Sequence, residues 1–422
     1  MDKFIIRGGV PLHGEVCVSG AKNAALPLLA ATLLSDAPYL FSGVPIVNDV
    51  LTLQRLLQRM GAVISDQTIQ VKQIENCEAP YDLVKTMRAA ILVLGPLLAR
   101  CGEARVSLPG GCAIGARPVE MHLSALRQMG AAVQIEHGMI HATAPRLRGA
   151  QIHFERATVT GTENLMMAAT LAEGTTILSN AASEPEVIDL AHFLIQCGAK
   201  VWGAGSDRIV IEGVSALHGA SYQVVPDRIE AATFIIAGAI AGGDLWVRGC
   251  RPEHLNALLD LLRRGGISIT IGNDFVRVHR PDPIPLQALD VVTHPYPGFP
   301  TDVQPQIMAL LSVATGCSRI TETIFENRFH HVPELERMGA HIHIEGNCAR
   351  IVGVPRLEGA HVMASDLRAG AALVLAGLAA EGETEVSRIY HIDRGYERIE
   401  EKLTGVGARI RRVSHGVVSH TM

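Results

Sequence analysis

The sequence has no surplus of basic residues. It contains 37 Lys and Arg against 42 Asp and Glu, which gives a formal charge of −5 at pH 7. Binding to a nucleic-acid backbone requires a strongly positive surface, because the contacted phosphates are neutralised by Lys and Arg. The composition therefore argues against nucleic acid as a partner.

Cysteine pairs and long apolar runs are also missing. The eight cysteines are scattered and form no CxxC pair, which is typical of reduced thiols in a cytoplasmic protein. The amino terminus reaches Gly8 and Gly9 before a signal-type apolar core can form, and the apolar run 89–99 is too short to cross a membrane. We therefore expect a cytoplasmic protein without a membrane partner.

Motifs for nucleotides and metals are absent as well. The chain has neither a Walker loop nor GxGxxG, HExxH or a carboxylate triad, so nucleotide hydrolysis, dinucleotide binding and zinc chemistry lack their usual signatures. The adjacent residues His330 and His331 have no third ligand at a familiar spacing, and we interpret them as packing or substrate contacts. No metal and no cofactor is predicted.

What the chain does contain is a repeat. Its six copies end in LLQRMGAVI, LRQMGAAV, LIQCGAKV, LLRRGGISI, LERMGAHI and LTGVGARI, with aligned glycines at 61, 130, 198, 265, 339 and 407. Each copy is typical of a helix that stops at a left-handed Gly and continues into a strand. Each also contains an earlier helix that is apolar on all sides and must therefore be buried.

The repeat predicts two α/β domains of three units each, with buried helices inside and sheets outside. At 422 residues the chain is long enough for more than one core. No Pro-rich or Ser-rich linker marks the boundary, which we place near residues 226–230. Residues 22–227 would form the first domain, and residues 1–21 with 228–422 the second, which the amino-terminal strand completes.

Basic residues stand where several of the buried helices begin. A cation in the first turn of a helix is electrostatically unfavourable, because that end is already partly positive. Lys22, Arg88 and Arg368 occupy such positions, and we interpret them as places where backbone N–H groups and a cation hold a carboxylate or phosphate. The alternative is a surface cation paired with a local acid, and recurrence at equivalent positions argues against it.

The segment LPGGCAIGARP places Cys112 among three glycines and close to Arg117. Pro118 suits the first position of a helix, so that Arg117 also stands at a helix entrance. Nearby positive charge favours the thiolate, and a bound phosphate would favour the thiol, so the ligand could decide whether Cys112 donates a proton. The glycines would let the segment close over a ligand. The alternative is a turn with an incidental cysteine.

These motifs, together with FPTDVQPQ, FENRFHHVPELERMGA and YHIDRGYERIEEKL, resemble the enolpyruvyl transferase family over essentially the whole chain. Within it, the resemblance is to the members that act on UDP-N-acetylglucosamine. It implies two inside-out, barrel-like α/β domains, each of three βαβαββ-type units, with the active site in the cleft between them. It also implies transfer of the enolpyruvyl group of phosphoenolpyruvate to the 3′-hydroxyl of UDP-N-acetylglucosamine with release of phosphate, the first committed step of peptidoglycan synthesis, without metal or cofactor.

The resemblance also assigns roles to single residues. Cys112 would be the active-site thiol and proton donor, and Asp302 the base. Phosphoenolpyruvate is expected to bind Lys22, Asn23, Arg117, Arg328, Arg368 and Arg394. UDP-N-acetylglucosamine is expected to bind Arg88, Arg117, Pro118, Val119, Glu120, Met121, Thr158, Val159, Thr160, Gly161, Asp302 and Ile324. Asp227 and Asp366 would support the site. Ala157 stands where some members carry a Lys, so the four residues after it are carried over largely as backbone and shape contacts.

Two other functions stay open at this point. The sister enzyme of the family transfers the same group to shikimate 3-phosphate, and the GGC loop and the RPVEM run argue against it. A silent sugar-nucleotide-binding regulator would not need an acid and a base together, which Cys112 and Asp302 supply. The sequence does not indicate the oligomeric state.

Overall fold

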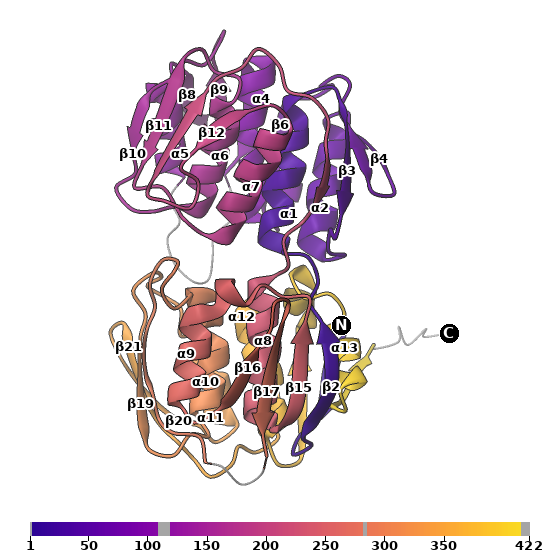
Figure 1. The fold of residues 1–422 in the computed structure, drawn as a ribbon, viewed down its shortest axis with the longest axis vertical. Coiled ribbons are helices and arrows are strands. Elements are labelled where there is room, and N and C mark those ends of the chain that lie inside the picture. Colours follow the sequence, from indigo (N-terminus) through magenta and orange to yellow (C-terminus); the bar gives the residue numbers. More distant parts are fainter. Residues whose placement is uncertain (1, 109–118, 282–284, 415–422) are drawn as a thin grey trace. The chain divides into compact units, whose positions relative to one another are not determined.

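The structure is a computed structural model that describes residues 2–108, 119–281 and 285–414 (Figure 1). It divides into two compact domains. Of the described residues, 20–108 and 119–225 form the first domain, and 2–19, 226–281 and 285–414 form the second. The chain passes between them after Ser19 and after Val225.

The first domain repeats one arrangement three times. Its four-stranded sheets have the orders β14-β3-β5-β4, β6-β7-β9-β8 and β10-β11-β13-β12. In each sheet the first two strands are parallel and the other pairs are antiparallel. The strands are β3 (Pro38–Ser42), β4 (Val63–Ser65), β5 (Thr68–Gln70), β6 (Glu78–Ala79), β7 (Glu103–Ser107), β8 (Ala132–Glu136), β9 (Met139–Thr143), β10 (Gln151–His153), β11 (Thr175–Ser179), β12 (Lys200–Trp202), β13 (Arg208–Glu212) and β14 (Ser221–Gln223). The helices are α1 (Lys22–Ala31), η1 (Thr32–Leu34), α2 (Asn48–Arg59), α3 (Tyr81–Val84), η2 (Arg88–Val93), α4 (Leu94–Cys101), α5 (Glu120–Gln128), α6 (Val159–Ala169) and α7 (Pro185–Gln196).

The second domain has the same plan, with sheets β16-β17-β15-β2, β18-β19-β21-β20 and β22-β23-β1-β24. The strands are β1 (Lys3–Arg7), β2 (Leu12–Cys17), β15 (Gly243–Arg248), β16 (Ser268–Ile271), β17 (Phe275–Arg280), β18 (Asp290–Val292), β19 (Cys317–Thr321), β20 (His341–Glu345), β21 (Cys348–Val352), β22 (His361–Met363), β23 (Glu383–Ser387) and β24 (Arg409–Val413). The helices are α8 (Arg228–Ala241), η3 (Pro252–Leu255), α9 (Asn256–Arg264), η4 (Thr301–Val303), α10 (Gln304–Leu311), α11 (Val332–Arg337), α12 (Leu367–Ala379), η5 (Ile389–Arg394) and α13 (Ile399–Gly405).

Strands from distant parts of the sequence complete the sheets. The amino-terminal strand β1 is antiparallel to both β23 and β24, and β2 is parallel to β15, so the first residues of the chain belong to the second domain. In the first domain, β14 comes last in the sequence and pairs in parallel with β3. Each domain is therefore closed by a strand from the opposite end of its sequence.

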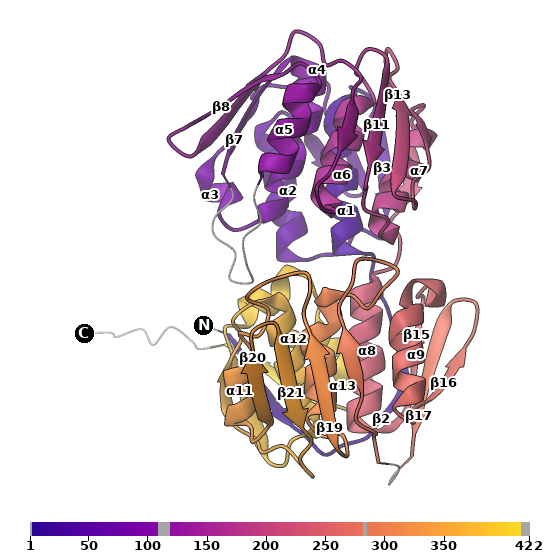
Figure 2. The same ribbon diagram turned by 90° about the vertical axis from the view of Figure 1, so that its left-hand side faces the viewer.

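The helices α1, α4 and α6 lie buried in the first domain, and α8, α10 and α12 in the second. Their apolar side chains form one hydrophobic core in each domain. The other repeat helices are amphipathic: in α9, the leucines 258, 259, 261 and 262 are buried, whereas Arg263 and Arg264 are exposed. Figure 2 shows strands β19, β20 and β21 on the outside of the second domain. The predicted inside-out arrangement is thus confirmed.

The glycines that end the amphipathic helices have the expected left-handed backbone in five of the six repeats. Gly61, for example, has φ 100° and Gly407 has φ 99°. In the fourth repeat the alignment was wrong by one residue: Gly265 has φ −76° and caps α9, and Gly266 takes the left-handed conformation with φ 87°. Gly265 thus occupies the place that Met60 has in the first repeat, as the cap that follows the last helical residue.

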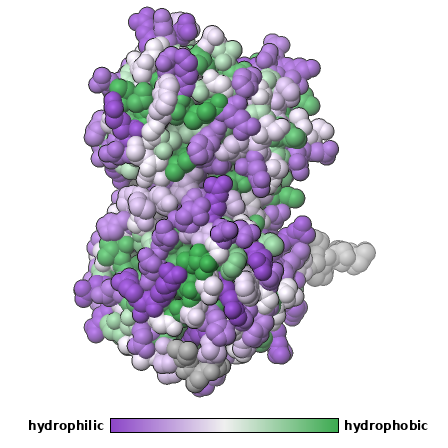
Figure 3. All heavy atoms as spheres, in the orientation of Figure 1, coloured by the Kyte–Doolittle hydropathy of each residue, from purple (hydrophilic) through white to green (hydrophobic). Residues whose placement is uncertain are grey.

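The surface carries both apolar and polar side chains. On the face drawn in Figure 3, small groups of apolar side chains are bordered by hydrophilic ones. Such scattered apolar surface is ordinary in folded domains. Within the part of the chain that the structure describes, none of the helices combines the length and the hydropathy that a membrane span needs.

Candidate active site

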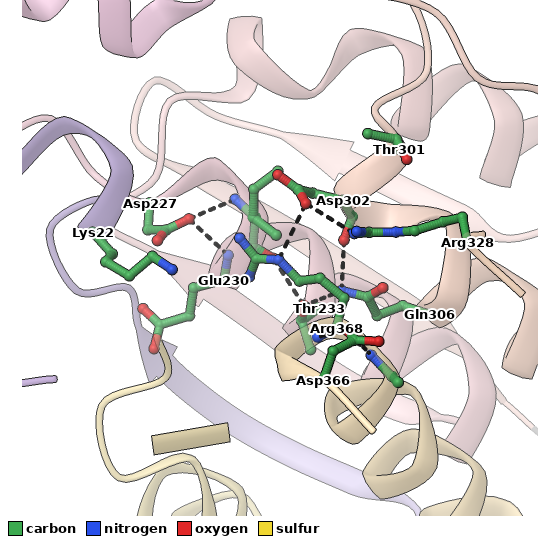
Figure 4. Close-up of polar contacts among 12 residues, drawn as sticks. Lys22, Asp227, Glu230, Thr233, Thr301, Asp302, Gln306, Arg328, Asp366 and Arg368 are labelled. Carbon is green, nitrogen blue, oxygen red and sulfur yellow. Dashed lines mark hydrogen bonds and ion pairs between the residues drawn. The ribbon is translucent and has the colours of Figure 1, made fainter. Parts of the chain in front are cut away.

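Asp302, the predicted base, lies in the second domain in η4, directly before the buried helix α10. Its Oδ1 atom is 3.0 Å from Nη2 of Arg328 and 3.5 Å from Nε of Arg368 (Figure 4). The side chain of Asp302 is 32% exposed, whereas that of Arg328 is 3% exposed. The structure therefore brings three predicted site residues together as one accessible carboxylate backed by two buried guanidinium groups.

Asp366 caps the helix that carries Arg368. Its Oδ1 accepts hydrogen bonds of 2.8 Å and 3.0 Å from the N–H groups of Arg368 and Ala369 at the start of α12. Burial raises the pKa of Asp366, but the charge of Arg328 and the two N–H groups outweigh it and hold that pKa below its usual value. Burial opposes the charge of Arg368, but the carboxylate of Asp302 outweighs this and raises the pKa of the guanidinium. Both side chains are therefore ionised.

Asp227 has the same local role at α8. Its Oδ1 accepts hydrogen bonds of 2.8 Å from the N–H of Ile229 and 3.0 Å from that of Glu230. A carboxylate at this position satisfies N–H groups that lack a partner within the helix and complements the positive helix end. The two predicted supporting residues, Asp227 and Asp366, are thus helix caps in equivalent repeats.

A buried glutamate that the sequence analysis did not single out holds the segment around Ile324. Oε1 of Glu322 accepts from the hydroxyl of Thr293 at 2.9 Å and from the N–H of Ile324 at 2.8 Å, and Oε2 accepts from the hydroxyl of Thr301 at 2.9 Å. Because Thr301 belongs to η4, Glu322 fixes the predicted nucleotide contact Ile324 to the turn that carries Asp302.

Of the two histidines, His331 is buried and contributes packing, whereas His330 is exposed. Nε2 of His331 is 3.2 Å from the sulfur of Met308 in α10. Burial lowers the pKa of His331 to about 4, so the ring is neutral at physiological pH. The structure contains no group of three or more His, Cys, Asp or Glu side chains able to hold a metal ion among the residues that it describes.

Lys22 and Asn23 begin helix α1 in the first domain. Nζ of Lys22 is 3.1 Å from Oδ2 of Asp49 in α2, and both side chains are buried. Arg368 is paired with Asp302 in a comparable way in the second domain. Acids of the chain itself therefore face these helix-start cations, as the alternative interpretation expects, but both cations are buried, and of the two acids Asp302 is partly exposed. Their binding of phosphoenolpyruvate stays a prediction.

The predicted nucleotide contacts of the first domain lie at helix starts. Thr158 is the amino-terminal cap of α6, and its Oγ1 accepts from the N–H of Gly161 at 3.3 Å. Val159 and Thr160 occupy the first turn between them. The positive end of this helix is a favourable environment for an anionic ligand.

Val119, Glu120 and Met121 lie at the start of α5, and Arg88 begins η2. Glu120 forms an exposed ion pair of 2.6 Å with Arg127 of the same helix. Like the residues of α6, these residues lie at the starts of helices in the first domain.

Arg394 is the last residue of η5 in the second domain. Three predicted site residues, Cys112, Arg117 and Pro118, lie outside the described residues. The roles of the predicted proton donor and of the residues around it therefore stay predictions.

The comparison with known families decides the classification. The family described as EPSP synthase (3-phosphoshikimate 1-carboxyvinyltransferase) matches residues 6–403. The chain belongs to the EPSP synthase family. This confirms the resemblance to enolpyruvyl transferases that the motifs indicated.

Two curated relatives of this EPSP synthase family member are both named UDP-N-acetylglucosamine 1-carboxyvinyltransferase. The relative from Nitratidesulfovibrio vulgaris (strain DSM 19637 / Miyazaki F) is 58% identical over 417 residues, which are 98% of this chain and 100% of the relative. The relative from Anaeromyxobacter sp. (strain K) is 58% identical over 425 residues, with the same coverage of 98% and 100%.

Solved structures of an enolpyruvyl transferase and of an EPSP synthase share the fold. The enolpyruvyl transferase NikO from Streptomyces tendae is similar with a TM-score of 0.88 and 27% identity, covering 98% of this chain and 99% of that one. EPSP synthase from Acinetobacter baumannii has a TM-score of 0.75 at 19% identity, covering 98% and 100%. At 19% identity, the similarity to the Acinetobacter baumannii enzyme concerns the fold alone.

The sequence analysis missed a further group of polar residues in the core of this EPSP synthase family member. Thr233, Gln306 and Tyr396 are buried beside Arg368 in the second domain, and His122 with Asn164 is buried in the first. A signal was present, because Asn164 and Gln306 stand directly before the apolar runs 165–169 and 307–311 of helices expected to be buried. A polar residue in a buried helix needs a hydrogen-bond partner, so each such position is a candidate for a structured polar site.

Proposed function

We propose that this chain is a UDP-N-acetylglucosamine 1-carboxyvinyltransferase, a transferase that moves the enolpyruvyl group of phosphoenolpyruvate to the 3′-hydroxyl of UDP-N-acetylglucosamine and releases phosphate. The observation that carries the proposal is the 58% identity, over 98% of the chain, to two relatives named for this reaction. The product would enter peptidoglycan synthesis.

The chemistry has two steps. In the addition, the 3′-oxygen bonds to C2 of phosphoenolpyruvate, the hydroxyl proton goes to a base, and the methylene carbon C3 gains a proton. In the elimination, the bond from C2 to the phosphate oxygen breaks, C3 loses a proton and phosphate leaves. The protein has to supply a base, an acid and cations that hold an anionic substrate.

Asp302 is our candidate for the base. Its carboxylate is partly exposed, and both guanidinium contacts are made to Oδ1. Two cations on one oxygen fix the direction of the carboxylate, and a general base has to be positioned in this way. Arg328 and Arg368 are buried, so the packing around them restricts their movement and they can hold Asp302 in place.

The remaining roles follow from the family motifs. Cys112 would deliver the proton to the methylene carbon. Lys22, Arg117 and Arg394 would bind phosphoenolpyruvate with help from Asn23, and Arg328 and Arg368 would add positive charge near Asp302. The helix starts at Arg88, Val119 and Thr158 would bind the sugar nucleotide, with Ala157 leaving its recognition there to backbone and shape.

Phosphate release from phosphoenolpyruvate tests the proposal, with each acceptor supplied separately. We expect release that depends on UDP-N-acetylglucosamine and not on shikimate 3-phosphate. Release with shikimate 3-phosphate alone would assign the chain to the other activity for which the family is named. Binding of the sugar nucleotide without release by either acceptor would indicate a silent regulator.

A further inference from the structure

Three buried helices of the second domain contact one another, and each contributes one polar side chain close to the start of the helix. The side chains are Thr233 of α8, Gln306 of α10 and Arg368 of α12, and Tyr396 lies among them shortly after η5. All four are buried. Figure 4 shows Thr233, Gln306 and Arg368 converging next to Asp302. Unpaired buried polar atoms are costly, so such a group is expected to be connected by hydrogen bonds. Within the described residues, Oε1 of Gln306 has no hydrogen-bond partner, whereas its Nε2 has three.

The hydrogen bonds among these side chains run in one direction. The hydroxyl of Thr233 donates to the carbonyl of Ile229, one turn earlier in α8, at 2.8 Å. Oγ1 of Thr233 can then only accept from the hydroxyl of Tyr396, which lies 2.8 Å away. The phenolic oxygen in turn accepts from Nη1 of Arg368 at 3.4 Å. Because the hydroxyl of Thr233 donates to the carbonyl of Ile229, the hydroxyl of Tyr396 has to donate to Thr233. The phenolic oxygen is left to accept from Arg368.

The ring of Tyr396 adds a second contact to the same guanidinium. Cζ of Arg368 lies 5.7 Å from the ring centroid, within the range of a cation–π interaction. Burial raises the pKa of Tyr396, so the hydroxyl keeps the proton that it donates to Thr233. Arg368 is therefore held by both the oxygen and the face of one side chain, while its Nε points to Oδ1 of Asp302 at 3.5 Å.

Gln306 connects the same two hydroxyls to the backbone of Asp302. Its Nε2 donates to the carbonyl of Asp302 at 3.0 Å and lies 3.3 Å from both Oγ1 of Thr233 and the phenolic oxygen of Tyr396. Asp302 is thus approached along two routes, through its side chain by Arg368 and through its main chain by Gln306. Both routes begin at the hydroxyl pair of Tyr396 and Thr233.

We propose that Tyr396 is a positioning residue for Asp302, which it orients through Arg368 and Gln306. This inference rests on the proposed function, in which Asp302 removes the proton of the acceptor hydroxyl. Tyr396 touches no reacting atom in this scheme. It fixes the direction of the carboxylate, so that its loss slows the chemical step and leaves the binding of UDP-N-acetylglucosamine nearly unchanged.

The test is Tyr396→Phe, which removes one oxygen and keeps the ring. We expect kcat to fall roughly tenfold to a hundredfold, the scale of a small misplacement of a reacting group, with KM for UDP-N-acetylglucosamine within about twofold of the parent. Thr233→Val, which removes the acceptor of the phenolic hydroxyl, should lower kcat in the same direction.

Tyr39→Phe is the matched control. Tyr39 is also buried, and its hydroxyl makes a hydrogen bond of 2.7 Å with Ser35 in the first domain. This variant should lose thermal stability comparably and retain the parental kcat. A kcat for Tyr396→Phe within about twofold of the parent, an equal loss in Tyr39→Phe, or a change in KM alone would overturn the inference. A parent enzyme that releases no phosphate with UDP-N-acetylglucosamine would instead refute the proposed function.

Discussion

Glu230 and Lys402 form an ion pair inside the second domain, with Oε1 and Nζ 2.7 Å apart. The carboxylate is only 2% exposed, and its other oxygen accepts from the N–H of Ser19 at 2.6 Å. Lys402 also donates to the hydroxyl of Ser19 at 2.7 Å. The pair therefore clamps the last residue of the second domain before the chain enters the first.

This pair makes stability depend on pH. Burial raises the pKa of Glu230 from 4.5 to about 7, although Lys402 acts in the opposite direction. The folded pKa lies above the unfolded one, so the stabilising contribution is complete below about pH 4.5 and is lost as the pH rises through about 7. We therefore expect the difference in melting temperature, Glu230→Gln minus parent, to be higher at pH 7.5 than at pH 5. Thermal unfolding at both values measures this.

Glu385→Gln is the control for that experiment. Glu385 is also paired with a lysine, at 2.6 Å from Lys3, but a hydrogen bond from this lysine lowers the pKa of the carboxyl. Its contribution is present at neutral pH and lost as the pH falls. Because this loss occurs below about pH 4.5, its Gln variant should show no comparable change between pH 5 and pH 7.5. The same trend in both variants would contradict the assignment to Glu230.

His122 should contribute to acid unfolding. Burial, helped by the charge of Arg88, lowers the pKa of its ring from 6.5 to about 4. Because the unfolded chain binds a proton that the folded one does not, stability rises with pH between about 4 and 6.5. Gln cannot take up this proton, so His122→Gln should lose less stability than the parent as the pH falls from 6.5 to 4. For two proteins of equal stability at pH 8, the variant would therefore unfold at the lower pH. Far-UV circular dichroism during acid titration measures the midpoint, with the exposed His341→Gln as control. If His122→Gln lost as much stability as the parent between pH 6.5 and pH 4, this histidine would not take up a proton on unfolding.

Local sequence signals were sufficient for the elements of the fold. Helix stops, apolar helices and the spacing between them predicted the six units, because each unit follows the same short-range rules. The fourth repeat shows the limit: both Gly265 and Gly266 fit a left-handed turn, and only the length of α9 decides between them.

The site was predicted in part from helix starts and in part from the resemblance. The position of Arg368 at a helix start singled it out, the resemblance assigned roles to Asp302 and Arg328, and the structure places the three in contact. Tyr396 was not predicted, because its role depends on hydrogen bonds to residues of three other elements that are far apart in the sequence. The joint binding of one phosphoenolpyruvate by Lys22 and Arg394 stays a prediction.

Cys112 should be alkylated selectively by an epoxide phosphonate such as fosfomycin. The phosphonate would dock on the cations predicted to bind phosphoenolpyruvate and present its ring to the sulfur. Burial raises the pKa of Cys197 to about 12 and that of Cys250 to about 11, so these thiols are poor nucleophiles. Cys17 and Cys317 are exposed and serve as internal controls. Peptide mass spectrometry should find the label at Cys112 alone, and Cys112→Ser should abolish it. Equal labelling of Cys17 or Cys317 would remove the reason to place an anion site beside Cys112.

Asp302→Asn should separate chemistry from binding. The variant keeps the shape of the side chain but cannot accept the hydroxyl proton, so we expect kcat to fall by about two to four orders of magnitude, the scale of a lost general base. Affinity for UDP-N-acetylglucosamine, measured by calorimetry, should change far less.

The structure adds a cost to this substitution. Arg328 and Arg368 are buried and both contact Oδ1 of Asp302, so the neutral Asn leaves two guanidinium groups without their shared anion. Charged hydrogen bonds of this kind contribute about 1.5–3 kcal/mol, and we expect a lower melting temperature in a protein that still folds. Tyr39→Phe, which loses a buried hydrogen bond outside the site, controls for stability loss alone. If Asp302→Asn turned over within a few-fold of the parent, Asp302 would be a substrate contact and another group would have to take the proton.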